Sequence, residues 1–323
     1  MGRAALLQPS DRIYVAGHRG LAGSAILRRL ERGGYRNLVV RTHAELDLIR
    51  QDDVEAFFRA ERPDHVFLAA AKVGGILAND TLRADFLYQN LMIQSNVIHA
   101  AWRHGAKKLL FLGSSCIYPR EAPQPMREEQ LLTGRLEPTN EPYAIAKIAG
   151  IKLCGAFNAQ YGTDFMSVMP TNLYGPGDNY DLAGSHVFPA LLRKAHEARR
   201  DRLAEMVVWG SGTPRRELMY SDDFADACVF LMERFTAAEV GEFVNVGTGV
   251  EHTITDIART AARAAGFTGS LRFDPSKPDG MPRKVMDVSR LRRLGWTAST
   301  AFEEGAVLAY RDYLDRFDAV AAA

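Results

Sequence analysis

The chain has 323 residues, of which 47% are hydrophobic and 24% are charged. This is the composition of an ordinary globular protein, and it excludes disordered, collagen-like and coiled-coil proteins. Forty lysines and arginines against 39 aspartates and glutamates leave a net charge of +1, so no overall field gathers nucleic acid or an anionic membrane. We therefore expect neither as a partner, and an anion must be bound at a local site.

Short apolar runs alternate with amphipathic stretches through the first 170 residues, which predicts an α/β fold with a doubly wound parallel sheet of the Rossmann type. The predicted strands are Ile13–Ala16, Leu38–Val40, Val66–Ala70 and Leu109–Leu112. The predicted helices between them are Ser24–Arg32, Val54–Ala60 and Leu82–His104.

The pattern changes after Tyr174, where turn residues introduce a mixture of helices and strands. The predicted elements are helix Val187–Arg199, strand Met206–Trp209, helix Ser221–Arg234 with Ser221 as its N-cap, strand Phe243–Val246, helix Thr255–Ala265, an ordered loop Asp274–Arg283 and a soft tail Ala319–Ala323. We expect residues 1–174, with 215–246 returning to them, to form the nucleotide-binding domain. Residues 175–214 and 247–323 would form a smaller C-terminal α/β substrate domain.

The three cysteines, Cys116, Cys154 and Cys228, cannot all form disulfides, and their spacing matches no metal-binding motif. Such usage is typical of a reducing compartment. The N-terminus lacks a run long enough for a signal peptide, and no apolar stretch approaches the roughly 20 residues of a membrane span. The sequence predicts a cytoplasmic protein without a metal ion.

The first predicted strand runs directly into Gly17-His18-Arg19-Gly20-Leu21-Ala22-Gly23 and then a helix. Three glycines at this spacing permit a tight turn, close approach of backbone N–H groups to a pyrophosphate, and packing of helix on strand. The pattern predicts a dinucleotide site, against the alternative of a plain glycine-rich turn.

The charge near the second strand indicates which nicotinamide cofactor is bound. Enzymes that use NAD usually place an Asp or Glu there, whereas this strand ends at Arg41 and the glycine loop carries Arg19. Two guanidinium groups suit a 2′-phosphate, which predicts NADP(H). The alternative is that both arginines are merely solvated.

Tyr143 and Lys147 lie four residues apart on a predicted helix that follows the capping candidate Asn140 and Pro142. An adjacent ammonium favours the phenolate and makes a proton donor for a carbonyl under reduction. Ser114 follows a strand, at the sheet edge where active sites of such folds lie. This combination resembles the extended short-chain dehydrogenase/reductase superfamily.

Longer runs resemble one family within it, the GDP-L-fucose synthases, and the likeness extends from the glycine loop to about Trp296. The runs are Gly17–Gly20, Ala71–Ile76, Gly113–Pro119, Glu137–Lys147, Met169–Pro176 and Lys277–Gly280. The resemblance implies NADPH-dependent conversion of GDP-4-dehydro-6-deoxy-D-mannose to GDP-L-fucose. That reaction epimerises C3 and C5 and then reduces the C4 ketone.

The resemblance also implies roles for individual residues. Ser114 and Tyr143 would hold the C4 oxygen, Lys147 would lower the pKa of Tyr143 and bind the nicotinamide ribose, Cys116 would be the base of epimerisation and His186 its acid. Besides the glycine loop and Arg41, further cofactor contacts are expected from Leu112, Gly113, Ser114, Ser115, Lys147, Pro170, Thr171, Asn172, Leu173 and His186. The GDP-sugar would contact Lys194, Trp209, Arg216 and Asp279.

Each role has a plainer alternative. Taken alone, Cys116 is a buried hydrophobe, Trp209 is a core residue and Lys194 is on a solvated helix face. Likewise, His186 is a capping or surface residue near a helix start, and Asn172 is a turn residue that satisfies backbone groups. Cys154 and Cys228 are interpreted as packing residues. The rival functions are another extended reductase or epimerase acting on a different nucleotide sugar, and a non-catalytic NADP(H)-sensing protein.

Relatives form dimers through a helix pair, which implies a homodimer through Leu82–His104. That helix carries enough apolar residues for such a contact, among them Leu87, Leu91, Val97 and Ile98. The same face can equally be covered by the sheet.

Overall fold

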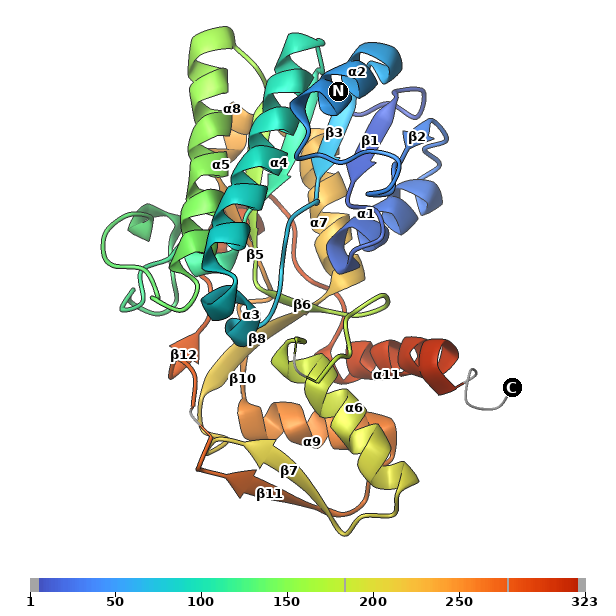
Figure 1. Cartoon of the computed structure of the whole chain (residues 1–323), viewed down its shortest axis with the longest axis vertical. Helices are drawn as coiled ribbons and strands as arrows, with labels where there is room; N and C mark the ends of the chain where they lie inside the picture. The colour runs from blue at the N-terminus through green and yellow to red at the C-terminus, as the bar shows by residue number, and fades with distance from the viewer. Residues whose placement is uncertain (1–5, 183, 278, 319–323) are drawn as a thin grey trace.

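The computed structural model describes residues 6–182, 184–277 and 279–318. Pro278, inside the expected loop Asp274–Arg283, and the expected tail Ala319–Ala323 lie outside the described residues. Figure 1 shows two lobes, an upper one around a central sheet and a lower one in which α6, α9 and α11 pack with short strands. Among the described residues, none of the helices is long and apolar enough to cross a membrane.

The upper lobe is built on a six-stranded parallel sheet with helices on both faces, as the alternating pattern predicts. In spatial order the strands are β2 (Leu38–Val39), β1 (Ile13–Ala16), β3 (His65–Leu68), β4 (Lys108–Leu112), β5 (Phe165–Pro170) and β9 (Val244–Val246). The helices of this lobe are α1 (Leu21–Arg32), α2 (Gln51–Glu61), α4 (Arg83–Arg103), α5 (Glu141–Tyr161) and α7 (Ser221–Arg234).

The two faces of the sheet carry separate hydrophobic cores. Tyr14 and Ala16 belong to the core formed with α2, α4 and α5, while Ile13 and Val15 belong to the core formed with α1 and α7. Successive side chains of a strand point to opposite faces, so a continuous apolar run satisfies both cores at once. This is why the short apolar runs of the sequence are strands.

The lower lobe is assembled around β8 (Arg215–Tyr220). It pairs with β6 (Asn172–Tyr174) and β12 (Arg283–Lys284) in parallel and with β10 (Glu251–Thr253) in antiparallel fashion. A separate parallel pair, β7 (Glu205–Trp209) and β11 (Ser270–Asp274), completes the strands. A third core joins α6 (Val187–Arg200), α9 (Ile254–Ala265) and α11 (Phe302–Tyr313).

The chain passes from the upper lobe to the lower lobe between β5 and β6. These strands are separated by one residue but belong to different sheets. Of the segment 215–246, β8 lies in the lower sheet, whereas α7 and β9 return to the upper lobe. Short elements complete the described chain: α3 (Ile76–Thr81), η1 (Ser115–Ile117), η2 (Glu128–Gln130), α8 (Ala237–Val240), α10 (Ser289–Arg293) and η3 (Leu314–Asp318).

Two local expectations are corrected by the structure. Tyr220, with extended backbone angles, is the N-cap residue of α7, and Ser221 is already its first helical residue. Asn140 is the N-cap residue of α5, but its side chain makes no capping hydrogen bond.

Val97 and Ile98 of α4 are fully buried in the first core, so the sheet covers them.

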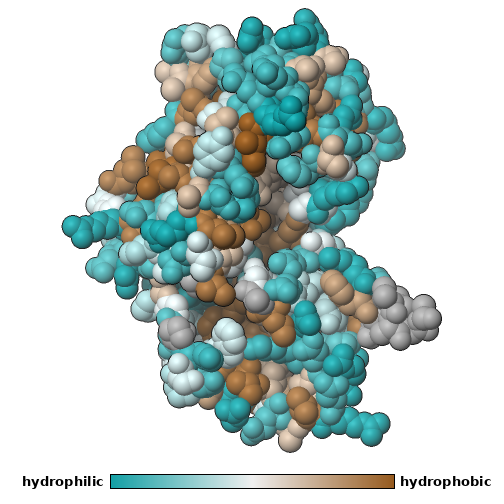
Figure 2. Space-filling view, viewed as in Figure 1, coloured by the Kyte–Doolittle hydropathy of each residue, from teal (hydrophilic) through white to brown (hydrophobic). Residues whose placement is uncertain are grey.

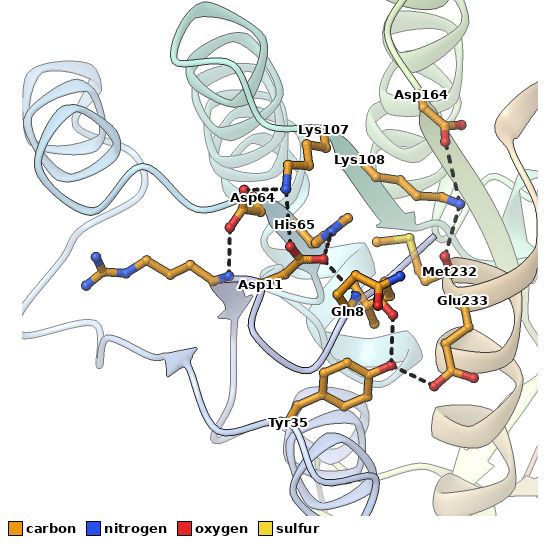
Figure 3. Close-up of polar contacts among 12 residues, drawn as sticks. Gln8, Asp11, Tyr35, Asp64, His65, Lys107, Lys108, Asp164, Met232 and Glu233 are labelled. Atoms are coloured by element: carbon orange, nitrogen blue, oxygen red, sulfur yellow. Dashed lines mark hydrogen bonds and ion pairs between the residues drawn. The ribbon is translucent and has the colours of Figure 1, made fainter. Parts of the chain in front are cut away.

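A polar network joins the amino ends of the strands, at the edge of the sheet opposite to the carboxyl ends (Figure 3). The Nε2 atom of the buried His65 lies 2.9 Å from an Asp11 oxygen, and Lys107 bridges Asp11 and Asp64. The ammonium of Lys108 is buried and donates to the Met232 carbonyl oxygen. These contacts hold one edge of the sheet and leave the other edge to the site.

Candidate active site

The glycine loop closes as a tight turn between β1 and α1. Gly17 has a φ of 84°, and a Cβ there would lie 2.7 Å from the backbone nitrogen of Ala70. A Cβ on Gly23 would collide with the Gly17 carbonyl. Gly20 is the N-cap residue of α1 and supplies no side-chain cap, so the first N–H groups of the helix remain available to an anion.

Features of this loop fit a dinucleotide. The loop Gly17–Gly23 forms an open cradle, because glycines occupy the positions where a side chain would fill it. His18 carries a buried Nδ1 atom without a hydrogen-bond partner among the described residues, and burial together with Arg19 lowers the pKa of its ring. A buried polar atom of this kind is expected to find its partner in a ligand. Arg19 and Gly20 are exposed at the mouth of the cradle.

Arg41 lies two residues after β2 and is not simply solvated. Its guanidinium pairs with Glu61, donates to the Val40 carbonyl oxygen at 2.8 Å, and lies 5.5 Å from the centre of the Phe57 ring. Glu61 also pairs with Arg12. The sequence argument missed this carboxylate, which shares its charge between two arginines and holds Arg41 in place.

The central pair lies at the start of α5. Lys147 is buried, and its Nζ atom donates to the Leu112 carbonyl oxygen at 2.9 Å and lies 5.8 Å from the centre of the Tyr143 ring. Phe86 packs edge-on against Tyr143, with ring centres 6.1 Å apart. Burial lowers the pKa of Lys147 to about 8, because a low-dielectric environment disfavours the ammonium.

The pKa of Tyr143 departs from the expectation in direction. Burial raises it above the ordinary value, Cys116 raises it further, and hydrogen bonding with Ser114 only partly opposes the rise. The lowering expected from Lys147 is not seen, because desolvation of the buried phenol dominates its pKa. A raised pKa keeps the phenol protonated at neutral pH, which is the form that donates a proton.

Ser114 and Cys116 lie in the turn that follows β4. Ser114 is the N-cap residue of η1, and its Oγ atom accepts a 3.4 Å hydrogen bond from the Cys116 backbone N–H. Cys116 is 8% exposed, and burial raises the pKa of its thiol while Lys284, Ser114 and Lys147 act in the opposite direction. Cys116 is buried, as its plainer interpretation predicts, but it is surrounded by polar groups.

His186 is the N-cap residue of α6, at the start of the lower lobe. The residue as a whole is exposed, but desolvation by the surrounding protein lowers the pKa of its ring, and Lys284 lowers it further. Figure 2 shows a recess in the surface between the two lobes. A lowered pKa means that the protonated imidazole, once formed, gives up its proton more readily than an ordinary imidazolium does.

The segment Pro170–Leu173 crosses from one sheet to the other. Thr171 donates its hydroxyl and Asn172 its amide to the same Glu217 carbonyl oxygen, at 3.2 and 3.1 Å. Glu217 is fully buried, and its carboxylate accepts hydrogen bonds from the backbone N–H groups of Thr248, Gly249 and Met286. Asn172 therefore satisfies backbone, as its plainer interpretation predicts, and it does so where the two lobes join.

An exposed indole marks the lower lobe. Trp209 is 58% exposed, which makes the core interpretation wrong, and Lys194 and Lys277 lie 4.6 and 5.6 Å from its ring centre. Lys194 also approaches the Val207 carbonyl oxygen at 3.4 Å, and burial lowers its pKa. Two cations beside one exposed aromatic ring form a surface suited to a flat anionic ligand.

Arg216 and Asp279 shape the same lobe in different ways. Arg216 donates to the Met281 carbonyl oxygen at 2.6 Å and is half-buried. Asp279 is exposed and accepts hydrogen bonds from the backbone N–H and hydroxyl of Ser211, at 2.9 and 2.6 Å. The carboxylate thus ties the loop after β11 to the turn after β7, and its charge acts on Arg216.

The structure adds one residue that sequence reasoning missed. Lys284 of β12 lines a small cavity together with Ser115, Cys116, Asn140 and Met281. The residues after the Lys277–Gly280 run, Met281-Pro282-Arg283-Lys284-Val285-Met286, do not alternate between polar and apolar, so the sequence carries only the signal of two adjacent basic residues. That signal gives no direction for the side chain, because the partner strand lies nearly 70 residues earlier.

Comparison with known proteins extends these observations. A family model for the NAD dependent epimerase/dehydratase family matches residues 13–247. GDP-L-fucose synthase 1 of Arabidopsis thaliana is 58% identical over 305 residues, which are 94% of this chain and 94% of that protein. GDP-L-fucose synthase of Escherichia coli (strain K12) is 56% identical over 316 residues, which are 95% of this chain and 98% of that protein.

A solved structure gives the same arrangement. GDP-mannoheptose C4 reductase from Campylobacter jejuni, with NADP bound, is 38% identical and has a TM-score of 0.89. The match covers 95% of this chain and 99% of that chain.

Proposed function

Because the chain belongs to the NAD dependent epimerase/dehydratase family, and within it to the GDP-L-fucose synthases, we propose that it converts GDP-4-dehydro-6-deoxy-D-mannose to GDP-L-fucose. The reaction epimerises C3 and C5 and then reduces C4. The observation that carries the proposal is the convergence of Ser114, Tyr143 and Lys147 with a buried cysteine, Cys116.

The cofactor is NADP(H), which supplies the hydride for the reduction when it is bound. The Gly17–Gly23 cradle and the N-terminus of α1 would hold the pyrophosphate, and Arg19 and Arg41 the 2′-phosphate. The pairing of Arg41 with Glu61 fixes the guanidinium before binding, which reduces the entropy lost when a phosphate is bound. The sheet-edge segments 112–115 and 170–173, with Lys147 and His186, complete the proposed cofactor site.

The C4 ketone is the common element of both reactions, because it acidifies the hydrogens on C3 and on C5. A site that polarises its oxygen therefore stabilises both enolates and later the alkoxide. The Ser114 hydroxyl and the Tyr143 phenol would hold that oxygen. The raised pKa of Tyr143 leaves it protonated, so that it delivers its proton to O4 at the reduction step.

Epimerisation needs a base on one face of the sugar ring and an acid on the other. Cys116 would take the proton from carbon, and His186, on the other lobe, would return one from the opposite face. Burial of each group, together with neighbouring charges, sets the pKa on which these roles depend. In the lower lobe Trp209 and Lys194 would flank the guanine nucleotide, Arg216 would bind the diphosphate, and Asp279 would fix the loop beside it.

One assay tests the proposal. The protein is incubated with NADPH and GDP-4-dehydro-6-deoxy-D-mannose, nicotinamide absorbance is followed, and the sugar product is identified by NMR. Oxidation of NADPH with formation of GDP-L-fucose is expected. A product reduced at C4 with unchanged C3 and C5 would contradict the epimerase half.

A second candidate is a C4 reductase of a different GDP-sugar, because a GDP-mannoheptose C4 reductase shares this fold at 38% identity. Such an enzyme would have no need for Cys116 and His186 as an acid–base pair. Oxidation of NADPH by a GDP-heptose ketone but not by the deoxyhexose ketone would favour it. A non-catalytic NADP(H) sensor would oxidise NADPH with neither sugar.

We also propose a homodimer formed through α4 and α5. These two helices pack together, and Trp102 of α4 stacks on Tyr161 of α5 with ring centres 4.3 Å apart. Tyr88 and Tyr161 are 59% and 46% exposed, which leaves apolar surface on the outer face of the pair. Light scattering at micromolar concentration is expected to give twice the chain mass, and a monomer mass would contradict the proposal.

A further inference from the structure

Lys284 is directed toward Cys116 by the geometry of β12. The strand pairs in parallel with β8, with Arg283 opposite Arg215 and Lys284 opposite Arg216. Successive side chains of a strand point to opposite faces. Arg283 accordingly points outward, where it donates to Glu251 at 2.6 Å, and Lys284 lines the small cavity that Cys116 also lines.

The two lysines near Cys116 differ in their hydrogen bonds and ion pairs. Lys147 donates to the Leu112 carbonyl oxygen and lies over the Phe111 and Tyr143 rings. Lys284, in contrast, makes no hydrogen bond or ion pair with the residues that the structure describes. A half-buried ammonium without an acceptor is costly, so burial favours the neutral amine until a group beside it becomes negative during the reaction.

Burial and neighbouring charged groups shift the pKa values of both Lys284 and Cys116. Burial and Arg216 lower the pKa of Lys284, while Cys116 and Glu217 raise it. Burial raises the pKa of Cys116, and Lys284 is the first of the groups that oppose the rise, ahead of Ser114 and Lys147. Lys284 also lowers the pKa of His186.

We propose that Lys284 is the positioning residue of the epimerisation base: its ammonium balances the charge of the Cys116 thiolate. The inference rests on the proposed function, in which Cys116 is the base. Transfer of a proton from the thiol to a neutral Lys284 amine breaks an S–H bond and forms an N–H bond. A neutral pair thus becomes an ion pair, and the net charge of the cavity does not change.

The later steps balance in the same way. The thiolate takes a proton from C3 or C5, which breaks a C–H bond, forms an S–H bond and moves the electron pair toward the C4 oxygen. His186, protonated from solvent, returns a proton to the carbon and is left as the neutral imidazole, and the Lys284 ammonium makes the protonated form a stronger acid. One cation therefore acts on base and acid in the directions that their roles require.

The first test measures the thiolate without any sugar. Thiolate absorbance in the ultraviolet is titrated against pH in the NADPH-bound protein, as the difference from Cys116→Ser. The other two cysteines do not interfere, because burial raises the pKa of Cys154 to about 12 and that of Cys228 well above its ordinary value. In Lys284→Met we expect the midpoint to rise by about one pH unit, which is roughly tenfold less thiolate at a given pH below the midpoint.

Two matched variants accompany it. Lys284→Arg keeps the charge and is expected to keep the midpoint near that of the wild type. Arg283→Met removes the neighbouring cation from the outer face and is expected to leave it unchanged. A wild-type midpoint in Lys284→Met would overturn the proposal, and a raised KM for the sugar nucleotide alongside it would make Lys284 a diphosphate ligand instead. If Lys284→Met does not fold, Lys284→Gln replaces it.

A second readout connects the thiolate to the reaction. In Lys284→Met we expect solvent-deuterium incorporation at C3 and C5 to fall about tenfold at neutral pH and to recover at higher pH, with NADPH affinity unchanged. Loss of incorporation at every pH would overturn the proposal. If the wild-type protein turns over no sugar but the midpoint still shifts, the proposed function fails while the coupling of Lys284 to Cys116 stands.

Discussion

The Nζ atom of Lys147 donates a 2.9 Å hydrogen bond to the backbone oxygen of Leu112, the last residue of β4. This bond ties α5 to the carboxyl end of β4. Tyr143 lies one helical turn before Lys147, and Ser114 lies two residues after Leu112, so one contact aligns the groups proposed to hold the sugar ketone. Helix, strand end and turn are thereby fixed before any ligand binds, which is the condition for effective electrostatic catalysis.

Removal of the Tyr143 hydroxyl should abolish reduction with little effect on folding. In Tyr143→Phe the aromatic contact with Phe86 is retained, but no phenol remains to protonate O4. A positioned general acid contributes about 10²- to 10⁴-fold, and we expect a loss of kcat in that range. The measurement is NADPH oxidation, with NADPH affinity followed by fluorescence. Tyr88→Phe, at an exposed tyrosine of α4, should behave as wild type, and an active Tyr143→Phe would remove the phenol from the mechanism.

The rate of reduction should depend on the charge of Lys147. Since burial lowers its pKa to about 8, we expect kcat to fall as the pH rises above about 8 and the ammonium is lost. Lys147→Arg, which stays protonated, should lack this decline even if its rate is lower. The same alkaline limb in both proteins would assign the decline to another group.

The effect of Lys147 on the free energy of unfolding should change with pH in the direction opposite to its effect on kcat. Its folded-state pKa lies below the ordinary value of 10.5, so the unfolded chain binds more protons between these two values. The free energy of unfolding should therefore rise with pH from about 8 to 10.5. Urea denaturation of the wild type and Lys147→Arg over this range measures the difference.

Cys116→Ser should uncouple epimerisation from cofactor binding. A serine hydroxyl fits the site but does not ionise near neutral pH, so deuterium from solvent should no longer enter C3 or C5. NADPH affinity should remain that of the wild type. Cys154→Ala, at the buried cysteine on α5, is the control and should keep the exchange. Undiminished exchange in Cys116→Ser would assign the base to another residue.

Arg41→Met should weaken the preference for NADPH over NADH. A hydrogen bond to a charged group contributes about 1.5–3 kcal/mol, so we expect the ratio of kcat/KM values to fall by roughly 10- to 150-fold. The loss should appear mainly in the KM for NADPH. Arg50→Met removes an exposed arginine that pairs with Asp53 and should leave the ratio unchanged. An unchanged ratio in Arg41→Met would leave Arg19 as the phosphate ligand.

The network at the far edge of the sheet should make stability sensitive to acid. The Nε2 atom of His65 contacts Asp11, while its buried Nδ1 atom has no partner among the described residues. Protonation would place a second N–H there without an acceptor, and burial lowers the pKa of His65 below 6.5 although Asp11 and Asp64 act to raise it and Lys107 to lower it. The unfolded chain therefore takes up the proton first, and stability should fall as the pH drops below about 6.5.

The measurement is the urea midpoint from pH 7.5 to 5. His65→Gln keeps an N–H donor for Asp11 but does not titrate, so its midpoint should change less over this range. The lowered pKa values of Asp11 and Asp64 act only at more acidic pH, since their ordinary value is 3.8. Equal slopes for the two proteins would place the acid sensitivity elsewhere.

The sequence by itself determined the features that depend on local spacing. The parallel strands follow from short apolar runs, the cradle from glycines three residues apart, and the shared face of Tyr143 and Lys147 from a separation of four residues on a helix. The charge of Arg19 in the glycine loop and of Arg41 after the second strand likewise predicted NADP(H), because both residues are placed by local spacing.

Only the tertiary structure decided the features that depend on packing between distant segments. Val97 and Ile98 face the sheet rather than a second copy, Trp209 is exposed with two lysines near its ring, and Glu61 holds Arg41 from 20 residues away. Burial reversed the direction expected for the pKa of Tyr143. Lys284 faces Cys116 because β12 pairs with β8, and no spacing in the sequence records that pairing. Desolvation and long-range charge arise from which elements meet, and a linear pattern of residues carries no information about that.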